Sequence, residues 1–249
     1  KSREITLEGI ILRKVPFRET SMILDIFTNK LGIIPVMAKG IRKEKSKNTG
    51  LIELLNELDL VLYKNPSSDW FIYKSAALTR AHLFEVDFKT GVLMQAAAEI
   101  YRQLIIPGED AEKLYELFLK YLQFIPQVKK NGIAIFWRFL LRLFRLIGIE
   151  FNSTTCINCG NKGNFIAYFP QKHGFICKKC FRPVYDDLVF EISGEQAELF
   201  SNINHIGNML DEIEISEENI NQLNRIFLTH LSEHFHKKFH LKSLDIYKV

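Results

Sequence analysis

Three short segments near the N-terminus decide the fold class: ITLEGIILRKV (residues 5–15), MILDIFT (residues 22–28) and IIPVMA (residues 33–38). Each is rich in β-branched residues and is flanked by turn-forming or charged residues, so each predicts a β-strand. The intervening Asn29-Lys-Leu-Gly32 has the composition of a tight turn, which predicts a hairpin between the second and third strands.

Two further runs, residues 58–63 and 71–78, have the same character, and the polar residues 64–69 between them suit another hairpin. Residues 51–58 carry apolar residues at helical spacing, which predicts a helical insert after the third strand. Five strands with such an insert fit a small barrel of the OB type, and an SH3-like barrel is the nearest alternative.

After residue 82 the hydrophobic pattern changes to the period of a helix. Residues 88–104 and 110–124 predict two amphipathic helices, and residues 132–147 predict a central helix that is apolar on most sides and stops at Gly148. Capping signals that begin at Ser193 and Ser216 predict two more helices, the last running to about His240.

All four cysteines lie in two C-x-x-C pairs, Cys156-Ile-Asn-Cys159 and Cys177-Lys-Lys-Cys180, separated by 17 residues. This spacing is typical of a structural zinc site, in which four thiolates complete a tetrahedral shell and leave no position for a substrate. Two disulfides in an exported protein are the alternative, but the initial KSREITLE contains no apolar segment of an export signal. We therefore expect one structural Zn²⁺ and a cytoplasmic location.

Together these patterns predict an α+β protein with an N-terminal five-stranded OB-type β-barrel over residues 1–80. An all-helical domain follows over residues 81–249 and carries the zinc nodule as an insertion at residues 154–183, with short ribbon strands inside it. A chain of 249 residues that is 47% hydrophobic can bury a sizeable core. Its longest apolar stretch, residues 132–149, contains three arginines and predicts a buried helix rather than a membrane span.

The positive charge is concentrated near the N-terminus. The formal net charge is +4, yet the first fifty residues hold eleven Lys or Arg against five Asp or Glu, a local +6. The remaining residues therefore carry about −2. A positive cluster beside a near-neutral remainder is typical of a protein that binds a polyanion.

Three stretches of the chain form a recognisable set. The first is the longest and comprises Gly9-Ile-Ile-Leu-Arg13, Phe17-Arg-Glu-Thr-Ser21, Leu24-Asp-Ile-Phe-Thr28, Gly32 and Ala38-Lys-Gly-Ile-Arg-Lys43 with Lys45-Ser46. The second is the cysteine nodule placed directly after Leu146-Ile-Gly148, and the third is Leu241-Lys-Ser243. In their order and spacing these stretches resemble the RecO family of bacterial recombination mediators.

The resemblance implies an OB domain, a helical domain and a zinc nodule in a protein that binds single- and double-stranded DNA. It also implies annealing of complementary strands and help in loading the RecA recombinase onto DNA coated by single-stranded DNA-binding protein (SSB), with RecR as the usual partner. RecA is then an indirect partner, and no membrane is involved.

The candidate DNA-binding residues lie on or near the barrel. The main group is a basic segment with glycines nearby, which can follow a phosphate backbone without reading bases; a solvated loop is the alternative. A second group lies on the first strand and the loop after it, and Trp70 at a loop edge could stack on a base, although such aromatics are more often core residues. The candidates are Lys39, Arg42, Lys43, Lys45, Lys47, Arg13, Lys14, Arg18 and Trp70.

Arg138, Arg142 and Arg145 share one face of the central helix and need either internal carboxylates or an external anion as partners. Internal pairing is favoured, whereas an Arg-lined apolar groove would suit the acidic, apolar-ended tail that the resemblance assigns to SSB. Four histidines form two i, i+4 pairs near the C-terminus: His230, His234, His236 and His240. A solvated or partly packed helix end is favoured over a metal site, because a third ligand is needed and nearby lysines repel a cation.

Three classes of function fit these residues. A DNA-binding and annealing protein without turnover chemistry leads, since annealing requires only charge neutralisation and closely held strands. A zinc-dependent enzyme acting on nucleic acids is disfavoured by the closed four-thiolate shell. A basic zinc-ribbon scaffold that binds an acidic protein is the remaining alternative.

Overall fold

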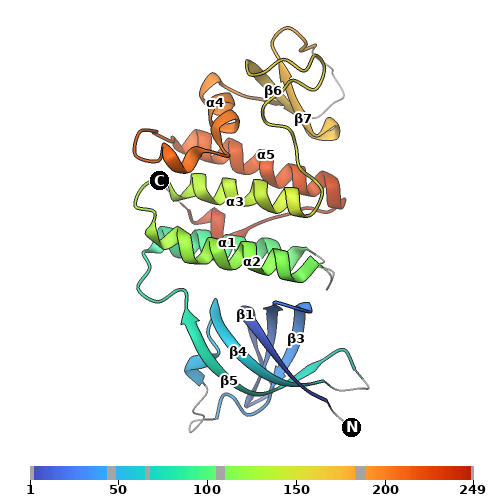
Figure 1. Ribbon diagram of the computed structural model, residues 1–249, viewed down its shortest axis with the longest axis vertical. Helices are drawn as coiled ribbons and strands as arrows, with labels where there is room; N and C mark the ends of the chain where they lie inside the picture. The colour runs from blue at the N-terminus through green and yellow to red at the C-terminus, as the bar shows by residue number, and fades with distance from the viewer. Residues whose placement is uncertain (1–2, 44–48, 65–67, 105–109, 183–188, 248–249) are drawn as a thin grey trace. The chain divides into compact units, whose positions relative to one another are not determined.

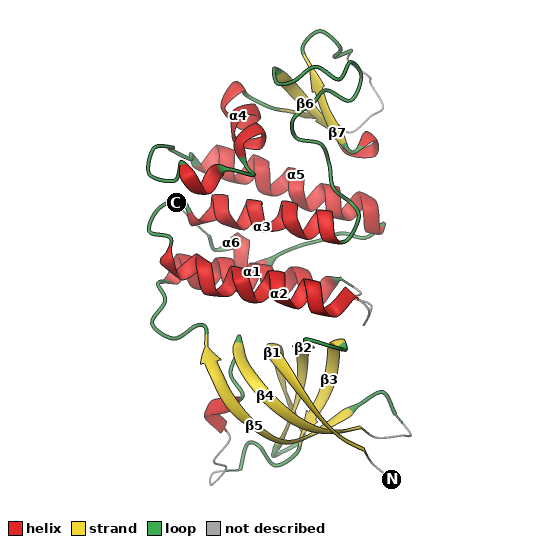
Figure 2. Ribbon diagram, viewed as in Figure 1, coloured by secondary structure: helices red, strands yellow, loops and turns green. Residues whose placement is uncertain are grey.

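The computed structural model describes residues 3–43, 49–64, 68–104, 110–182 and 189–247 (Figure 1). Its contacts divide the chain into two compact units, Lys1–Pro126 and Gln127–Val249. The first contains the strands near the N-terminus and two helices, and the second contains helices and a small three-stranded sheet (Figure 2). Among the described residues, no helix is both long and apolar enough to cross a membrane.

The first unit is built on a five-stranded barrel with the strand order β1-β2-β3-β5-β4, and β4 pairs in turn with β1. The β3–β5 pairing is parallel and covers only two residue pairs, whereas the other pairings are antiparallel. This is the arrangement of an OB barrel, and it confirms the predicted architecture. The strands are β1 (Arg3–Phe17), β2 (Ser21–Thr28), β3 (Gly32–Ala38), β4 (Asn56–Lys64) and β5 (Phe71–Ala81).

The predicted hairpin between β2 and β3 is present. Thr28 pairs with Gly32 across it, and the Thr28 hydroxyl donates to the Gly32 carbonyl while accepting from the Leu31 backbone N–H. Gly32 has φ of 68°, a left-handed conformation that glycine adopts without steric cost. The hairpin expected over residues 64–69 falls largely outside the described residues, although Lys64 of β4 pairs directly with Phe71 of β5.

The prediction of a helical insert over residues 51–58 was wrong. The structure has only a single 3₁₀ turn, η1 (Thr49–Leu51), and residue 56 already belongs to β4. The apolar residues that suggested a helix, Ile52 and Leu55, are instead almost fully buried in an irregular connection, and Leu55 has a positive φ. Burial of these side chains next to the barrel therefore outweighs their helical spacing.

Gly9 marks a close approach inside the barrel wall. A Cβ atom at this position would lie 2.7 Å from Ile26 Cγ2 and 2.8 Å from Leu60 Cδ1, and both of these residues are fully buried. We expect Gly9→Ala to lower the free energy of unfolding by about 1–3 kcal/mol because the core must shift to admit the methyl group. Urea unfolding would measure this. Gly50→Ala is the matched control, since no atom of the described residues lies within 4 Å of its added Cβ. Equal effects of the two substitutions would contradict the prediction.

Two helices belong to the same compact unit as the barrel: α1 (Phe88–Gln103) and α2 (Ala111–Phe124). The ring of Phe27 on β2 lies 5.0 Å from that of Tyr101 on α1 and 5.5 Å from that of Tyr115 on α2. By contacts the first unit thus continues to residue 126, because these buried aromatic rings fasten the helices to the barrel. The division into domains at residue 80 stays a prediction.

The second unit contains α3 (Gly132–Leu146), α4 (Gly194–Asn202), α5 (Glu217–Phe235) and α6 (Lys242–Asp245). Gly148 stops α3 as predicted: it has φ of 75°, and the Ile149 N–H turns back to donate to the Phe144 carbonyl. The predicted caps are also present, with Ser193 forming a capping box with Gln196 and the Ser216 side chain accepting from the Asn219 N–H.

The last long helix ends earlier than predicted. α5 finishes at Phe235, because His236 adopts a left-handed conformation with φ of 49° and its N–H donates to the Ser232 carbonyl. The expected helical run to His240 was therefore wrong, and only His230 and His234 form a helical i, i+4 pair. His240 lies beyond α5 and pairs with Asp245 at 3.0 Å.

The predicted ribbon strands are present as β6 (Phe165–Phe169) and β7 (Gly174–Cys177), connected by η4 (Pro170–Lys172), and β8 (Phe190–Glu191) adds a third strand. Phe151 fastens this ribbon to the helices. Its ring lies 5.6 Å from Phe175 of β7 and 5.6 Å from Phe227 of α5. The zinc-type nodule is thus not a loosely tethered insertion but shares an aromatic core with the helices of its unit.

Candidate nucleic-acid interface and metal centre

Two turns at one end of the barrel form a concave, positively charged surface, which we call the basic hollow. The β1–β2 turn supplies Arg18, and the turn after β3 supplies Lys39 and Lys43. All three side chains belong to exposed residues. The hollow has a volume of about 660 Å³ and is lined by Phe17, Arg18, Thr20, Ser21, Met37, Lys39, Gly40 and Lys43.

Arg42 fastens the two turns together. Its backbone N–H donates to the Thr20 carbonyl at 2.9 Å, and its guanidinium Nη1 donates to the Arg18 carbonyl at 3.4 Å. Arg18 itself has φ of 52°, and its guanidinium lies 5.2 Å from the centroid of the Phe17 ring. Gly40, with φ of 68°, allows the sharp bend that brings Lys43 back toward the hollow. The structure thus brings Arg18, Lys39, Arg42 and Lys43 together.

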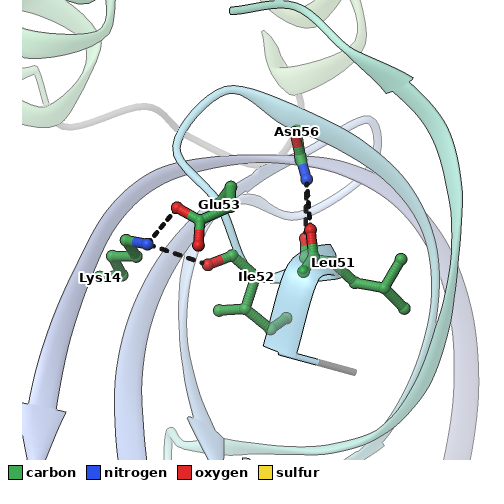
Figure 3. Close-up of polar contacts among 6 residues, drawn as sticks. Lys14, Leu51, Ile52, Glu53 and Asn56 are labelled. Carbon is green, nitrogen blue, oxygen red and sulfur yellow. Dashed lines mark hydrogen bonds and ion pairs between the residues drawn. The ribbon is translucent and has the colours of Figure 1, made fainter. Parts of the chain in front are cut away.

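Arg13 and Lys14 are arranged differently, because each has an acidic partner. Arg13 Nε donates to Asp25 Oδ2 at 2.6 Å across the β1–β2 pair. Lys14 contacts the Glu53 carboxylate and donates to the Ile52 carbonyl at 3.3 Å, as Figure 3 shows. These two cations are largely balanced by neighbouring carboxylates and have less charge to offer an external phosphate.

The remaining DNA-binding candidates are less well placed or lie outside the described residues. Lys45 and Lys47 fall in the segment 44–48, outside the described ranges. Trp70 is 38% exposed and immediately precedes β5, where the next residue, Phe71, pairs with Val36 of β3. By this register Trp70 lies beside β3, about two residues, or 7 Å, along that strand from Met37, which lines the basic hollow.

The four cysteine sulfurs converge on one point. They all lie within 4.8 Å of one another, and none of the four cysteines forms a disulfide. Cys159 Sγ is 3.8 Å from Cys177 Sγ, and the Cys177 N–H donates to Cys156 Sγ. Each C-x-x-C pair forms a tight turn, or knuckle. In the first, at Cys156–Cys159, Gly160 has φ of 71° and its N–H donates to the Cys156 carbonyl. This arrangement of Cys156, Cys159, Cys177 and Cys180 is close enough to hold one metal ion.

The thiol of Cys156 loses its proton more easily than an ordinary cysteine thiol. Burial opposes its ionisation, but hydrogen bonds from the backbone N–H groups of Cys177, Cys159 and Asn158 outweigh that penalty and lower its pKa to about 6. A thiolate is the form that binds a metal. Several adjacent thiolates repel one another unless a cation lies between them, so the cluster favours an occupying metal ion.

The three arginines of α3 have three different environments. Arg145 pairs with Glu150 at 2.6 Å, as the internal-pairing interpretation requires. Arg142 is exposed. Arg138 is partly buried, and this burial, together with the positive charge of Arg142, lowers the pKa of Arg138. The Nε atom of Arg138 is buried and has no hydrogen-bond partner in the described part of the chain. The face is therefore only partly neutralised within the described residues.

Sequence reasoning missed two basic or ligand-bearing features. A larger hollow of about 850 Å³ lies between the ribbon and α4, with Lys162, Lys178 and Lys179 among its lining residues. His173, in the β6–β7 turn, lies beside His230 and His234 of α5. The lysines could have been found from the sequence, because residues 151–182 contain five Lys or Arg and no Asp or Glu. The position of His173 had no such signal.

Known protein families match nearly the whole chain. The N-terminal model of recombination protein O matches residues 3–80, and the C-terminal model matches residues 86–245. The DNA repair protein RecO of Acetivibrio thermocellus is 27% identical over 246 residues, which cover 95% of this chain and 96% of that relative. The DNA repair protein RecO of Mycoplasma capricolum subsp. capricolum is 30% identical over 190 residues, or 74% of each chain.

A shorter match is to the DNA repair protein RecO of Chloroherpeton thalassium, 32% identical over 159 residues, which cover 61% of this chain and 60% of that relative. The two family models meet between the barrel and the first helix, and together they account for both compact units. With the OB-type barrel, the helices and the clustered cysteines all in place, the chain belongs to the RecO family of DNA repair and recombination proteins.

Proposed function

We propose that this chain binds single- and double-stranded DNA through the basic hollow and anneals complementary strands. The observation that carries the proposal is the convergence of Arg18, Lys39 and Lys43 around one concavity at the end of an OB-type barrel. Arg42 holds the two contributing turns together, and Lys45 and Lys47 continue the basic segment in the sequence. Loops at such barrel ends are among the places where OB folds receive oligonucleotides.

This surface suits the phosphate backbone rather than base edges. Lysine and arginine side chains around a shallow hollow neutralise phosphates irrespective of sequence, and the hydroxyls of Thr20 and Ser21 in its lining can donate to phosphate oxygens. Trp70 is the candidate for stacking on a base. Arg13 and Lys14, which are paired with carboxylates, take a secondary part.

Annealing requires that two strands be neutralised and held close together. Within the second unit, the lysines around the larger hollow, Lys162, Lys178 and Lys179, offer a further cationic surface for DNA. Family membership supports the further proposal that the chain helps to load RecA onto SSB-coated DNA together with RecR in the bacterial cytoplasm. None of these steps requires turnover chemistry.

We further propose that the four cysteines hold one structural Zn²⁺. Four thiolates form the closed tetrahedral shell that structural zinc sites use. The metal would then maintain the turn that carries Lys178 and Lys179, between Cys177 and Cys180, rather than act on a substrate.

A titration of a fluorescent single-stranded oligonucleotide at three salt concentrations tests the DNA proposal. If Arg18, Lys39, Arg42 and Lys43 all engage phosphates, a plot of the logarithm of the association constant against the logarithm of salt concentration should have a slope of about −3 or steeper. The same protein should accelerate annealing of complementary oligonucleotides. Absence of binding even at low salt would contradict DNA binding by this surface.

That negative outcome would favour the alternative function, a basic scaffold for an acidic protein partner.

The arginines of α3 support an acidic protein partner independently of DNA binding. Arg142 is exposed beside Arg138, whose buried Nε has no hydrogen-bond partner among the described residues. We propose that Arg138, Arg142 and Arg145 bind the acidic tail of SSB. Fluorescence anisotropy with a labelled acidic peptide would separate this function from DNA binding, because Arg142→Glu should weaken peptide binding and leave oligonucleotide binding at the barrel unchanged.

A further inference from the structure

Three histidines that are scattered in the sequence meet in the second unit. His173 ends the turn between β6 and β7, and His230 and His234 lie one helical turn apart on α5. The rings of His173 and His234 are stacked with their centroids 3.9 Å apart, and the His230 ring lies 4.5 Å from His234 and 5.6 Å from His173. One ring nitrogen of each histidine lies within 4.8 Å of those of the other two.

We propose that His173, His230 and His234 form a second metal site, separate from the cysteines, for a divalent first-row transition-metal ion such as Zn²⁺ or Co²⁺. Imidazole nitrogen is a preferred ligand of these ions. In a tetrahedral zinc site with Zn–N distances of about 2.0–2.1 Å, ligand nitrogens are about 3.3 Å apart. The ligand nitrogens therefore need to approach one another by about 1.5 Å at most, which the side chains reach by rotating out of the stacked arrangement.

Two of the three histidines hold ring nitrogens that require a partner. Nδ1 of His173 and Nε2 of His234 are both buried, and neither has a hydrogen-bond partner among the residues that the structure describes. A buried polar atom left in this state costs about 1–3 kcal/mol, so the fold bears a penalty at two adjacent imidazoles. A metal ion bound by both nitrogens would remove the penalty, which is the physical reason to place the ion here.

Two of the three rings, His230 and His234, also favour the neutral state that a metal requires. Burial, together with the proximity of His234 and His173, lowers the pKa of His230 to about 3. Burial and the neighbouring His173 and His236 lower the pKa of His234. Neutral imidazoles present lone pairs, so the ion competes with fewer protons near pH 7 than at an exposed histidine.

His230 has the orienting hydrogen bond that metal-bound histidines usually have. Its Nε2 lies against the Ile149 carbonyl, which can only accept, so Nε2 carries the proton. Nδ1 therefore accepts from the Tyr168 hydroxyl at 2.7 Å. Binding by His230 must exchange this hydrogen bond for the bond to the metal, which makes Tyr168 a competitor of the ion.

The charged groups near the three histidines include an acidic one. Burial raises the pKa of Tyr168 and the nearby Glu233 raises it further, while the Lys237 ammonium lies over the Phe239 ring, 4.9 Å from its centroid. Since η4 packs against α5 next to these residues, a metal bound here would tie the β6–β7 turn of the ribbon to the longest helix of the unit.

Titration of Co²⁺ into the full chain, with the cysteine site already filled with zinc, tests the proposal. We expect one further equivalent to bind, with the weak visible absorption of a nitrogen-ligated ion and without the near-ultraviolet charge-transfer band that thiolates give. His173→Asn and His234→Gln should each weaken this binding by about 100-fold or more. Asparagine suits the left-handed backbone of residue 173, and glutamine retains the helix. His205→Ala, at an exposed histidine, is the matched control.

Tyr168→Phe distinguishes a metal site from a merely structural histidine cluster. The substitution removes the competing hydroxyl, so Co²⁺ should bind about tenfold more tightly, whereas the metal-free protein should lose stability because His230 Nδ1 loses its donor. The proposal is overturned if the native chain binds no second equivalent, or if both His173→Asn and His234→Gln bind Co²⁺ as the native chain does. DNA binding is measured separately and does not enter either result.

Discussion

Cys177→Ser is expected to release the metal from the cysteine site and to lower the free energy of unfolding of the second unit by about 4 kcal/mol or more. Cys177 is buried, ends β7, and its backbone N–H donates to Cys156 Sγ. A serine hydroxyl is not ionised near pH 7 and is a poor ligand for zinc. The three remaining sulfurs then no longer complete the shell, and the two C-x-x-C turns lose the ion that would link them.

The measurement combines the metal content of the purified chain with its thermal unfolding. Lys179→Ser is the matched control, because it lies between the second pair of cysteines but is exposed and makes no contribution to the shell. We expect the control to retain the metal and to unfold as the native chain does. An unchanged melting temperature and metal content in Cys177→Ser would show that the cysteines hold no structural metal.

Reversing two charges in the basic hollow should have the next largest effect. In Lys39→Glu combined with Lys43→Glu, each phosphate contact that is lost is also replaced by repulsion. We expect the affinity for single-stranded DNA to fall about 100-fold at low salt. The slope of the salt dependence should become shallower by about 1.4, because each of the two contacts contributes about 0.7 on a single strand. The annealing rate should fall in parallel.

Arg42 is left unchanged in this variant because its hydrogen bonds to Thr20 and Arg18 hold the turns together. Lys89→Glu combined with Lys113→Glu is the control, since both lysines are exposed on the helices of the same unit and the change in net charge is identical. Equal loss of affinity in the two double variants would mean that overall charge, and not the basic hollow, attracts the DNA.

Much of the fold followed from local patterns in the sequence. Periodicity and contacts between near neighbours, both contained in a short window of sequence, decide these elements. They are the strands, the turn at Gly32, the three helices from residue 88 to 146 and the caps at Ser193 and Ser216. The cysteine cluster followed for a similar reason, since each C-x-x-C pair builds its own knuckle.

The insert after β3 and the end of α5 were misjudged because local spacing did not decide them. Ile52 and Leu55 are buried individually beside the barrel, and the left-handed turn at His236 ends the helix despite a sequence that could continue it. In both places the burial of particular side chains or the path of the chain outweighed helix propensity.

The sequence by itself determined the fold class, the cysteine cluster and the position of the basic segment, because each depends on residues close together along the chain. Only the tertiary structure decided which charges are available. It paired Arg13 with Asp25 and Lys14 with Glu53, residues 12 and 39 positions apart, and gathered Arg18, Lys39 and Lys43 around one hollow. It likewise brought His173 to His230 and His234. Ion pairs and ligand sets depend on distances across the fold, and no spacing along the sequence specifies those distances.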